Sequence, residues 1–342
     1  MKVLLVKMSS MGDVLHTLPA ITDLKAHNPA IALHWVVEAN FAHLAQWHSG
    51  VDKIIPIEQR KWLKHPGWHS FQQWRLWQQA LQQTHYDVVI DAQGLLKSAI
   101  ITRAARTHQG KPAQRHGFDA PREPLAKLAY HHRHTIDAGL HAVTRTRQLF
   151  AQTFGYAVTT TPNFGIQPYF TDAQASTAPV VLIPGTTWHT KHWHFAHWVS
   201  LAQALIQRQL PVYVIWGSPQ EKAIAQALQA TVPEVQFADQ RESIECVARQ
   251  LNGAMAVVGV DTGFTHIAGA LGTPTLALYG PTSSAKVGLL GPDTHNYASQ
   301  LACAPCHKRS CQFQKQGDIQ APECQQKLSP SNVLNWLEAY LP

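Results

Sequence analysis

The sequence predicts two α/β domains, each built on a doubly wound parallel sheet, with a cleft between them. Short apolar, β-branched runs alternate with segments of helical periodicity in both halves of the chain, as repeated β-α units require. Between the halves, residues 159–162 and 171–179 contain Thr and Pro without either periodicity, which favours a linker. A length of 342 residues is also long for one domain and comfortable for two.

Nine apolar runs are expected to form the strands of these sheets. Those of the first half are Val3–Val6, His34–Val37, Lys53–Ile57 and Asp87–Asp91. Those of the second half are Val180–Ile183, Pro211–Ile215, Val235–Phe237, Ala256–Val260 and Thr275–Tyr279. A helix is expected from Ser329 to Leu341, with Ser329 as N-cap and Pro330 in its first turn. Functional loops follow the carboxyl ends of such strands, so the residues after each run are candidate site residues.

Composition limits the class of partner. A hydrophobic content of 45% and a charged content of 14% exclude a disordered chain. The formal net charge of +7 and the 21 His favour anionic partners, such as nucleic acid, a phosphosugar or a membrane surface. The sequence contains no run of eighteen apolar residues, so no membrane-spanning helix is predicted. The strand-like start with Asp13 does not fit a signal peptide. We therefore expect a cytoplasmic protein.

The loop after the first run carries an acid, Asp13, where a dinucleotide-binding protein would carry glycines. Asp at this position is often simply a helix N-cap. It could equally act as a general base that takes a proton from a sugar hydroxyl. Pro19 further predicts a kink or a late start of the helix that follows.

Two loops of the second half have the composition of anion sites. Asp261, Thr262, Gly263 and His266 lie where a buried strand meets a helix of small residues, and the free N–H groups of a helix start attract anions. Residues 184–193 contain a second set of hydroxyl and basic groups suited to phosphate, namely Thr186, Thr187 and Lys191. No G-x-G-x-x-G follows a strand and no Walker loop is present, which argues against a dehydrogenase and an ATPase.

Residues 59–81 combine basic and aromatic side chains. On a helix, Trp74, Trp77 and Leu81 share one face, which could simply pack on the core. The same stretch could be an interfacial element, with Trp at the level of the lipid headgroups and Arg and Lys at the phosphates. Nucleic-acid binding also uses such residues, but no nucleic-acid motif accompanies them.

Four of the five cysteines lie close together in the sequence, at Cys303, Cys306, Cys311 and Cys324. Four thiolates could hold a structural zinc ion in a tetrahedral site. Free or redox-active thiols are the alternative. A catalytic zinc is not expected, because four protein ligands leave no open position.

Several segments, in order along the chain, resemble the type I lipopolysaccharide heptosyltransferases of glycosyltransferase family 9. The matching segments are residues 6–20, 91–98, 122–126, 191–193, 261–263 with His266, and 279–282. The resemblance implies a GT-B fold with two Rossmann-like domains. Residues 1–165 would bind the acceptor and residues 166–328 would bind ADP-heptose. The C-terminal helix, 329–342, would pack back towards the first domain.

The resemblance also implies an activity. It is the inverting, metal-independent transfer of heptose from ADP-L-glycero-β-D-manno-heptose to the inner Kdo of Kdo2-lipid A, in lipopolysaccharide inner-core biosynthesis. The enzyme would be peripheral to the cytoplasmic face of the inner membrane of a Gram-negative bacterium, with no required cofactor and no nucleic-acid partner. One alternative is a heptosyltransferase II that adds the second heptose. Another is a non-catalytic binding protein that senses lipid or metal.

Roles for single residues follow from the same resemblance. Asp13 matches the base that deprotonates the acceptor hydroxyl. The donor-binding matches are Thr186, Thr187, Lys191, Glu221, Asp261, Thr262, Gly263 and His266. The acceptor-binding matches are Ser10, Arg60, Lys61, Lys64 and Arg122. The chain departs from the pattern at Lys61, where Arg is common, and at Trp188 and His189, which replace more charged residues.

Overall fold

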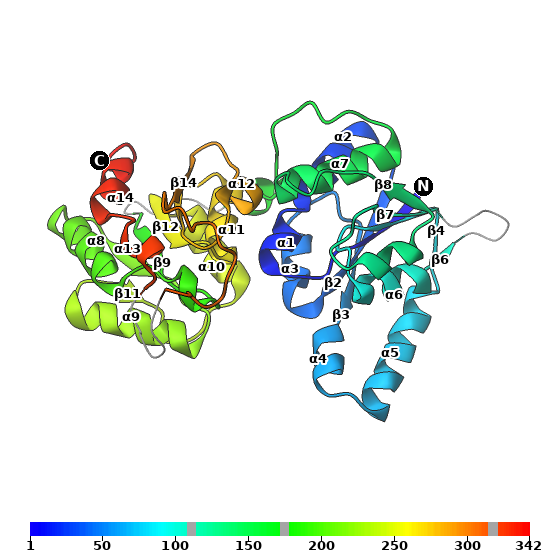
Figure 1. The fold of residues 1–342 in the computed structure, drawn as a ribbon, viewed down its shortest axis with the longest axis horizontal. Helices are drawn as coiled ribbons and strands as arrows, with labels where there is room; N and C mark the ends of the chain where they lie inside the picture. The colour runs from blue at the N-terminus through cyan, green and yellow to red at the C-terminus, as the bar shows by residue number, and fades with distance from the viewer. Residues whose placement is uncertain (108–113, 172–177, 314–320) are drawn as a thin grey trace. The chain divides into compact units, whose positions relative to one another are not determined.

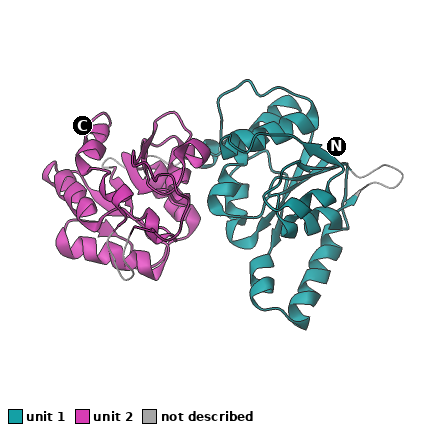
Figure 2. Ribbon diagram, viewed as in Figure 1, with its two compact units in different colours: residues 1–169 teal, residues 170–342 magenta. Residues whose placement is uncertain are grey.

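The computed structural model describes residues 1–107, 114–171, 178–313 and 321–342. It divides into two compact units, which are residues 1–169 (unit 1) and residues 170–342 (unit 2), as Figure 2 shows. Each unit contains its own six-stranded sheet (Figure 1). The predicted pair of doubly wound parallel sheets is therefore confirmed.

Unit 1 is built on a parallel sheet with the strand order β3-β2-β1-β5-β7-β8. Its strands are β1 (Lys2–Val6), β2 (Ala32–Glu38), β3 (Lys53–Ile57), β5 (Val88–Asp91), β7 (Gln114–Phe118) and β8 (His132–His134). β4 (His85–Tyr86) and β6 (Arg106–Thr107) form a separate two-stranded sheet. The order reverses between β1 and β5, the switch point at which ligands bind in such sheets.

The helices of unit 1 follow the strand ends. They are α1 (Met11–Leu15), α2 (Leu18–His27), α3 (Ala42–Gln46), α4 (Gln59–Lys64), α5 (Trp68–Leu81), α6 (Leu96–Ala104) and α7 (Ala142–Phe154). Short 3-10 helices are η1 (Ala39–Phe41), η2 (Pro124–Ala129) and η3 (Gln167–Tyr169). Pro19 lies in the first turn of α2, where its missing N–H costs nothing, so the predicted late helix start is confirmed.

The core of unit 1 explains part of the aromatic stretch. Leu4 and Val6 of β1 are fully buried, together with Leu81 at the end of α5. Trp74 and Trp77 pack against this same cluster and are partly buried. For the face that carries these residues, the interpretation as a core-packing helix is confirmed.

Unit 2 repeats the arrangement with the strand order β11-β10-β9-β12-β13-β14, again parallel. Its strands are β9 (Val180–Ile183), β10 (Val212–Val214), β11 (Gln236–Phe237), β12 (Ala256–Val260), β13 (Thr275–Tyr279) and β14 (Thr294–Ala298). Its helices are η4 (His189–Lys191), α8 (Phe195–Gln207), α9 (Pro219–Thr231), α10 (Ile244–Asn252), α11 (Gly263–Leu271), α12 (Ser284–Val287), α13 (Glu323–Gln326) and α14 (Pro330–Leu337). The switch point of this sheet lies between β9 and β12.

The C-terminal helix α14 ends at Leu337, short of the expected Leu341. The Ser329 hydroxyl accepts a hydrogen bond from the Asn332 amide at 3.2 Å, so the predicted N-cap is confirmed. Val333 and Leu337 are fully buried in the core of unit 2, and α14 packs on α8 of the same unit. Among the described residues, no helix has the length and apolar character needed to cross a membrane.

Candidate catalytic and donor-binding sites

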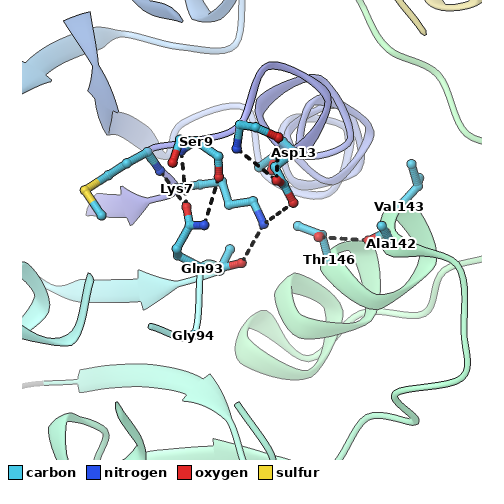
Figure 3. A network of polar contacts seen from close by, with 12 residues as sticks. Lys7, Ser9, Asp13, Gln93, Gly94, Ala142, Val143 and Thr146 are labelled. Carbon is cyan, nitrogen blue, oxygen red and sulfur yellow. Dashed lines mark hydrogen bonds and ion pairs between the residues drawn. The ribbon is translucent and has the colours of Figure 1, made fainter. Parts of the chain in front are cut away.

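The carboxylate of Asp13 is fixed by the loop that follows β1 (Figure 3). Asp13 Oδ2 accepts hydrogen bonds from the Ser10 amide at 2.8 Å and from the Ser10 hydroxyl at 3.0 Å. Its side chain nevertheless remains 42% exposed. The bonds orient the carboxylate at the start of α1 and leave part of it open to a ligand. The N-cap of α1 is Ser10 and Asp13 is its third helical residue, so the interpretation of Asp13 as N-cap is wrong, although its carboxylate completes a capping box.

Lys7 keeps this carboxylate charged. The Lys7 ammonium lies 3.4 Å from Asp13 Oδ1, and it donates a hydrogen bond to the Ala92 carbonyl at 3.1 Å. Partial burial works against ionisation of Asp13, but the Lys7 charge, the Ser10 bonds and His16 outweigh it and lower its pKa to about 2. Asp13 is therefore ionised at neutral pH, as a proton acceptor must be.

Gln93 holds the same loop from the turn that follows the neighbouring strand β5. Its Oε1 accepts from the Met8 amide at 2.9 Å and from the Ser9 amide at 3.3 Å, while its Nε2 donates to the Ser9 carbonyl at 2.8 Å (Figure 3). Lys7 and Gln93 are absent from the predicted site. Both lie within the segments 6–20 and 91–98 that carry the resemblance. Their positions directly after two predicted strands are the sequence signal that could have identified them as site residues.

The turn that carries Gln93 is anchored by buried Asp91. Its carboxylate accepts from the amides of Gln93 and Gly94, from the Ser98 hydroxyl at 2.8 Å and from the Tyr130 hydroxyl at 2.8 Å. Gly94 has a φ of 67°, a left-handed conformation that favours glycine. Burial raises the pKa of Asp91, although these hydrogen bonds oppose the rise. Asp91 thus supports the loop and is closed to a ligand.

The predicted acceptor residues other than Ser10 lie on two elements. Arg60, Lys61 and Lys64 are exposed on α4, after β3. Arg122 is exposed in the loop after β7, and the neighbouring Glu123 amide donates to the Gly94 carbonyl at 3.1 Å. The four basic residues therefore follow strands of one sheet, at the same edge as the Asp13 loop.

Two further charged residues join this edge and are absent from the predicted site. Glu38 ends β2, is 4% exposed, and accepts from the Arg60 amide at 3.0 Å. Burial raises the pKa of Glu38. Burial and the Arg60 charge lower the pKa of Lys97, while Glu38, Glu123 and Asp13 oppose that change. Lys97 thus connects α4 electrostatically with the carboxylate of Asp13.

In unit 2, Asp261 is the centre of a buried polar network. Its Oδ2 accepts from the Lys191 ammonium at 2.7 Å and from the Thr282 hydroxyl at 2.7 Å, and its Oδ1 lies 3.1 Å from His266 Nε2. Burial favours the neutral acid, but His266 and Lys191 outweigh it and hold the pKa of Asp261 well below its usual range. Three predicted residues are thereby brought into contact, and Thr282 is added to them.

The start of α11 presents its amides beside this network. Thr262 is the N-cap residue, its side chain caps no backbone amide, and Gly263 begins the helix. The first N–H groups of such a helix are available to an anion, and the helix dipole favours negative charge. With Lys191 beside them, these groups form a positive site at the carboxyl ends of β9 and β12.

Thr186 and Thr187 lie on the β9 loop that also carries Lys191. Thr186 is partly exposed, with its carbonyl 2.9 Å from His192 Nε2, and Thr187 is exposed. Both hydroxyl side chains thus belong to the same strand-end loop as the Lys191 ammonium. The loop accordingly offers one cation and two hydroxyl groups to a ligand.

Glu221 has a structural task in α9. Its Oε2 accepts from the amides of Gly217 at 2.7 Å and Ser218 at 3.0 Å, completing a capping box. A Cβ at Gly185 would lie only 2.4 Å from Glu221 Cγ, so this glycine allows α9 to approach the β9 loop. The S-x-x-E pattern at residues 218–221 is the sequence signal for the cap.

Trp188 lies between two cations. The Lys191 ammonium is 4.9 Å from its ring centroid, and the Arg309 guanidinium is 5.0 Å from it. The Thr190 hydroxyl also donates to the Lys308 carbonyl at 2.8 Å, which joins the Cys-rich segment to the β9 loop. Arg309 therefore adds a second cation beside Trp188, through a contact between residues far apart in the sequence.

The four clustered cysteines are free thiols. Burial raises the pKa of Cys324 to about 11, and the thiols of Cys303, Cys306 and Cys311 contribute to that rise. Within the described parts of the chain, no three His, Cys, Asp or Glu side chains are arranged to hold a metal ion.

Comparisons with known proteins identify the family of the chain. The family model described as glycosyltransferase family 9 (heptosyltransferase) matches residues 73–316. Lipopolysaccharide heptosyltransferase 1 of Pseudomonas aeruginosa is 41% identical over 354 aligned residues, covering 100% of this chain and 98% of that protein. Lipopolysaccharide heptosyltransferase 1 of Escherichia coli K12 is 41% identical, covering 85% of this chain and 91% of that protein.

Solved structures give the same result for the fold. The structure of E. coli heptosyltransferase WaaC with ADP has a TM-score of 0.85 at 35% sequence identity, with 100% of both chains covered. The structure of E. coli heptosyltransferase II has a TM-score of 0.76 at 19% identity and shows the shared fold alone. The predicted GT-B fold is confirmed. The chain therefore belongs to glycosyltransferase family 9, and it is a heptosyltransferase of the lipopolysaccharide core.

Proposed function

We propose that this chain transfers L-glycero-D-manno-heptose from ADP-L-glycero-β-D-manno-heptose to the inner Kdo of Kdo2-lipid A, with inversion and without a metal ion. The observation that carries the proposal is the Asp13 carboxylate, which is oriented by Ser10, kept ionised by Lys7 and left 42% exposed. A donor in which the leaving group is a nucleoside diphosphate is supported by solved relatives bound to ADP and to ADP-2-deoxy-2-fluoro heptose.

In the proposed step, the acceptor oxygen forms a bond to the anomeric carbon while the bond from that carbon to the diphosphate breaks. The hydroxyl proton passes to Asp13, and ADP leaves. A carboxylate with a pKa of about 2 is a weak base towards a neutral alcohol. It becomes adequate late in the step, because bonding to the electron-poor carbon makes the hydroxyl proton strongly acidic. Ser10 and Lys7 keep it in the ionised form until the proton is transferred.

The departing diphosphate requires positive potential that is already in place. Lys191, held by Asp261, and the free amides at the start of α11 would supply it in unit 2. Because Asp261 is held by Lys191, Thr282 and His266, it orients the cation and does not itself serve as a base. This division assigns acceptor activation to unit 1 and donor binding to unit 2.

The type I acceptor is favoured by the extent of the similarity. Type I relatives are 41% identical over 85% to 100% of this chain. A lipooligosaccharide heptosyltransferase 2 from Haemophilus influenzae is 34% identical over only 27% of it. The basic residues of α4 and Arg122 fit the several negative charges of Kdo2-lipid A. With such a lipid acceptor, we propose that the enzyme works at the cytoplasmic face of the inner membrane.

ADP release by the purified chain tests this proposal. With ADP-heptose and Kdo2-lipid A, we expect Asp13→Asn to lower kcat/KM by about 10³-fold with little change in donor KM. Asp87→Asn is the matched control, because Asp87 lies at the opposite edge of the same sheet and accepts from the Lys2 amide. Turnover by Asp13→Asn within tenfold of wild type would refute the base assignment.

Two further arms separate the alternatives. Preference for a heptosylated acceptor over Kdo2-lipid A would indicate a heptosyltransferase II, and absence of ADP release with both would favour a binding protein. We expect EDTA to leave the rate unchanged. A loss of activity that magnesium restores would contradict a metal-independent mechanism.

A further inference from the structure

The helical hairpin formed by α4 and α5 presents an apolar surface that the fold does not use. Figure 1 shows the two helices extending side by side away from the sheet of unit 1. On these two helices, Leu63 is 67% exposed, Trp68 is 72% exposed and Leu76 is 60% exposed. Phe71 is half exposed, and its ring lies 5.6 Å from that of Trp68. We call these four residues the hairpin patch.

The opposite side of the hairpin accounts for its stability. Trp62, Trp74 and Trp77 pack on the core of unit 1, and Trp77 Nε1 donates to the Pro56 carbonyl at 2.8 Å. Leu81 is buried in the same core. The inner aromatic side chains thus attach the hairpin to the core of unit 1. The four residues of the hairpin patch are not among the side chains packed on that core. Large apolar side chains gathered on an exposed surface are typical of an interaction site.

The charge of the hairpin is uniformly positive. Residues 59–81 contain four Lys or Arg and no Asp or Glu. The Arg75 guanidinium lies 5.9 Å from the ring centroid of Phe71, so cations and exposed rings are interleaved. Lys61 forms an exposed ion pair with Glu58 at 3.1 Å. Exposed aromatic rings among basic residues match the interface of an anionic bilayer.

The hairpin is also continuous with the proposed acceptor site. The Arg60 amide donates to Glu38 at the end of β2, and Gln59 Nε2 donates to the Lys97 carbonyl at 3.4 Å. Lys97 in turn lies within electrostatic reach of Asp13. A lipid whose headgroup reaches this edge of the sheet has its acyl chains in a bilayer, so a bilayer contact close to this edge is required.

We propose that the hairpin patch inserts into the surface of an anionic lipid bilayer, with Arg60, Lys61, Lys64 and Arg75 at the level of the phosphates. This inference rests on the proposed function, because it is the lipid acceptor that requires a membrane. A second copy of the chain is a poorer occupant, since a symmetric contact would bring two uniformly positive hairpins together.

Binding to vesicles tests the inference. The probe is sedimentation with vesicles made of equal parts phosphatidylcholine and phosphatidylglycerol, compared with vesicles of phosphatidylcholine alone. We expect Trp68→Ser combined with Phe71→Ser to weaken binding to the anionic vesicles by about tenfold or more. Phe313→Ser is the matched control, because Phe313 is 70% exposed but lies in unit 2. Binding by the double variant within twofold of wild type would overturn the inference.

The basic residues have a separate arm. We expect Lys61→Gln combined with Lys64→Gln to weaken binding by about fivefold per charge removed, and added salt to weaken binding of the wild type. Equal wild-type binding to both kinds of vesicle would overturn the electrostatic part. Self-association of the wild type that the Trp68→Ser, Phe71→Ser variant abolishes would assign the patch to a second copy instead.

Activity distinguishes failure of this inference from failure of the proposed function. The Trp68→Ser, Phe71→Ser variant should release ADP at the wild-type rate with a deacylated, water-soluble acceptor. It should be slower with the acceptor embedded in vesicles. Equal rates of variant and wild type in both formats overturn the inference and leave the proposed function intact. No ADP release by the wild type in either format overturns the proposed function, whereas the vesicle-binding result stands independently.

Discussion

Replacing Asp261 by Asn should destabilise unit 2 far more than the same change at Asp13 destabilises unit 1. In the Lys191–Asp261 pair the side chains are only 15% and 7% exposed, and one carboxylate oxygen accepts from both Lys191 and Thr282. An asparagine keeps one carbonyl oxygen but removes the negative charge. The Lys191 ammonium would then be buried without a counter-ion.

The size of the effect follows from this burial. Breaking a buried ion pair on one side costs about 3–5 kcal/mol, and the remaining amide oxygen places Asp261→Asn near the lower value. A loss of about 3 kcal/mol would lower the thermal midpoint of a unit of this size by about 6–12 °C. Asp13 is 42% exposed, so water screens its ion pair and Asp13→Asn should cost about 1 kcal/mol or less.

Hydrogen exchange measures the two units separately. If α11 opens together with unit 2, a loss of about 3 kcal/mol makes its amides exchange about a hundredfold faster in Asp261→Asn. Amides of α2, in unit 1, serve as the internal reference and should not change. Combining Asp261→Asn with Lys191→Met should recover part of the lost stability, because the buried Lys191 ammonium without a counter-ion is then absent.

An acceleration of α11 exchange by less than about threefold would refute this reasoning. Strict additivity in the double variant would refute it as well, since it would show that the two charges do not interact. Acceleration of α2 and α11 to the same extent would mean that the variant acts on the whole chain and not through the buried pair.

Three further predictions concern titrating groups. Lys7→Met removes the charge 3.4 Å from Asp13 and should raise the pKa of Asp13 from about 2 by roughly one unit. Carboxyl-carbon NMR titration measures this pKa, and an unchanged value would contradict the ion pair. Burial and neighbouring His residues lower the pKa of His116 to about 3, so its neutral form is favoured in the fold and stability falls as pH drops below about 6.5. We expect a loss of about 2 kcal/mol between pH 7 and pH 5 that His116→Phe removes, and an unaltered pH dependence in that variant would exclude His116 as the cause. Among the clustered thiols, Cys324 should react slowest with a thiol reagent at pH 8, because its pKa is about 11. Equal reactivity of all four would contradict this order.

Apolar strands could be predicted from the sequence because their apolar composition indicates that they are buried. Val180–Ile183 and Ala256–Val260 have the predicted bounds and are buried throughout. The strands β7, β8 and β14 are missing from the prediction, because QRHGF, HRH and THNYA are polar and lie towards one end of each sheet. Strands with a polar composition form because they pair with a neighbouring strand. The local sequence pattern does not indicate this pairing.

The sites divide in the same way. Lys191, Asp261 and His266 could be found as candidates because each lies after a strand or at a helix start. Their mutual contacts, and those of Thr282 and Arg309, depend on residues far apart in the sequence that the sheet brings together. The hairpin shows another limit. Periodicity identifies the face that carries Trp74, but the exposure of Trp68 becomes visible only after the core has formed.

The hydrogen bonds between Gln93 and the loop before Asp13 have a consequence for folding. The loop before Asp13 is fixed by a side chain that is 85 residues away from Met8 in sequence, so the carboxylate has its native position only once β1 and β5 are paired. Pairing of segments so far apart is slow compared with the formation of a short helix such as α1. Regain of activity during refolding should therefore lag behind regain of helical circular dichroism. A fragment that ends before residue 93 would keep Asp13 and its partner Ser10, but it would lack the Gln93 contact that positions their loop.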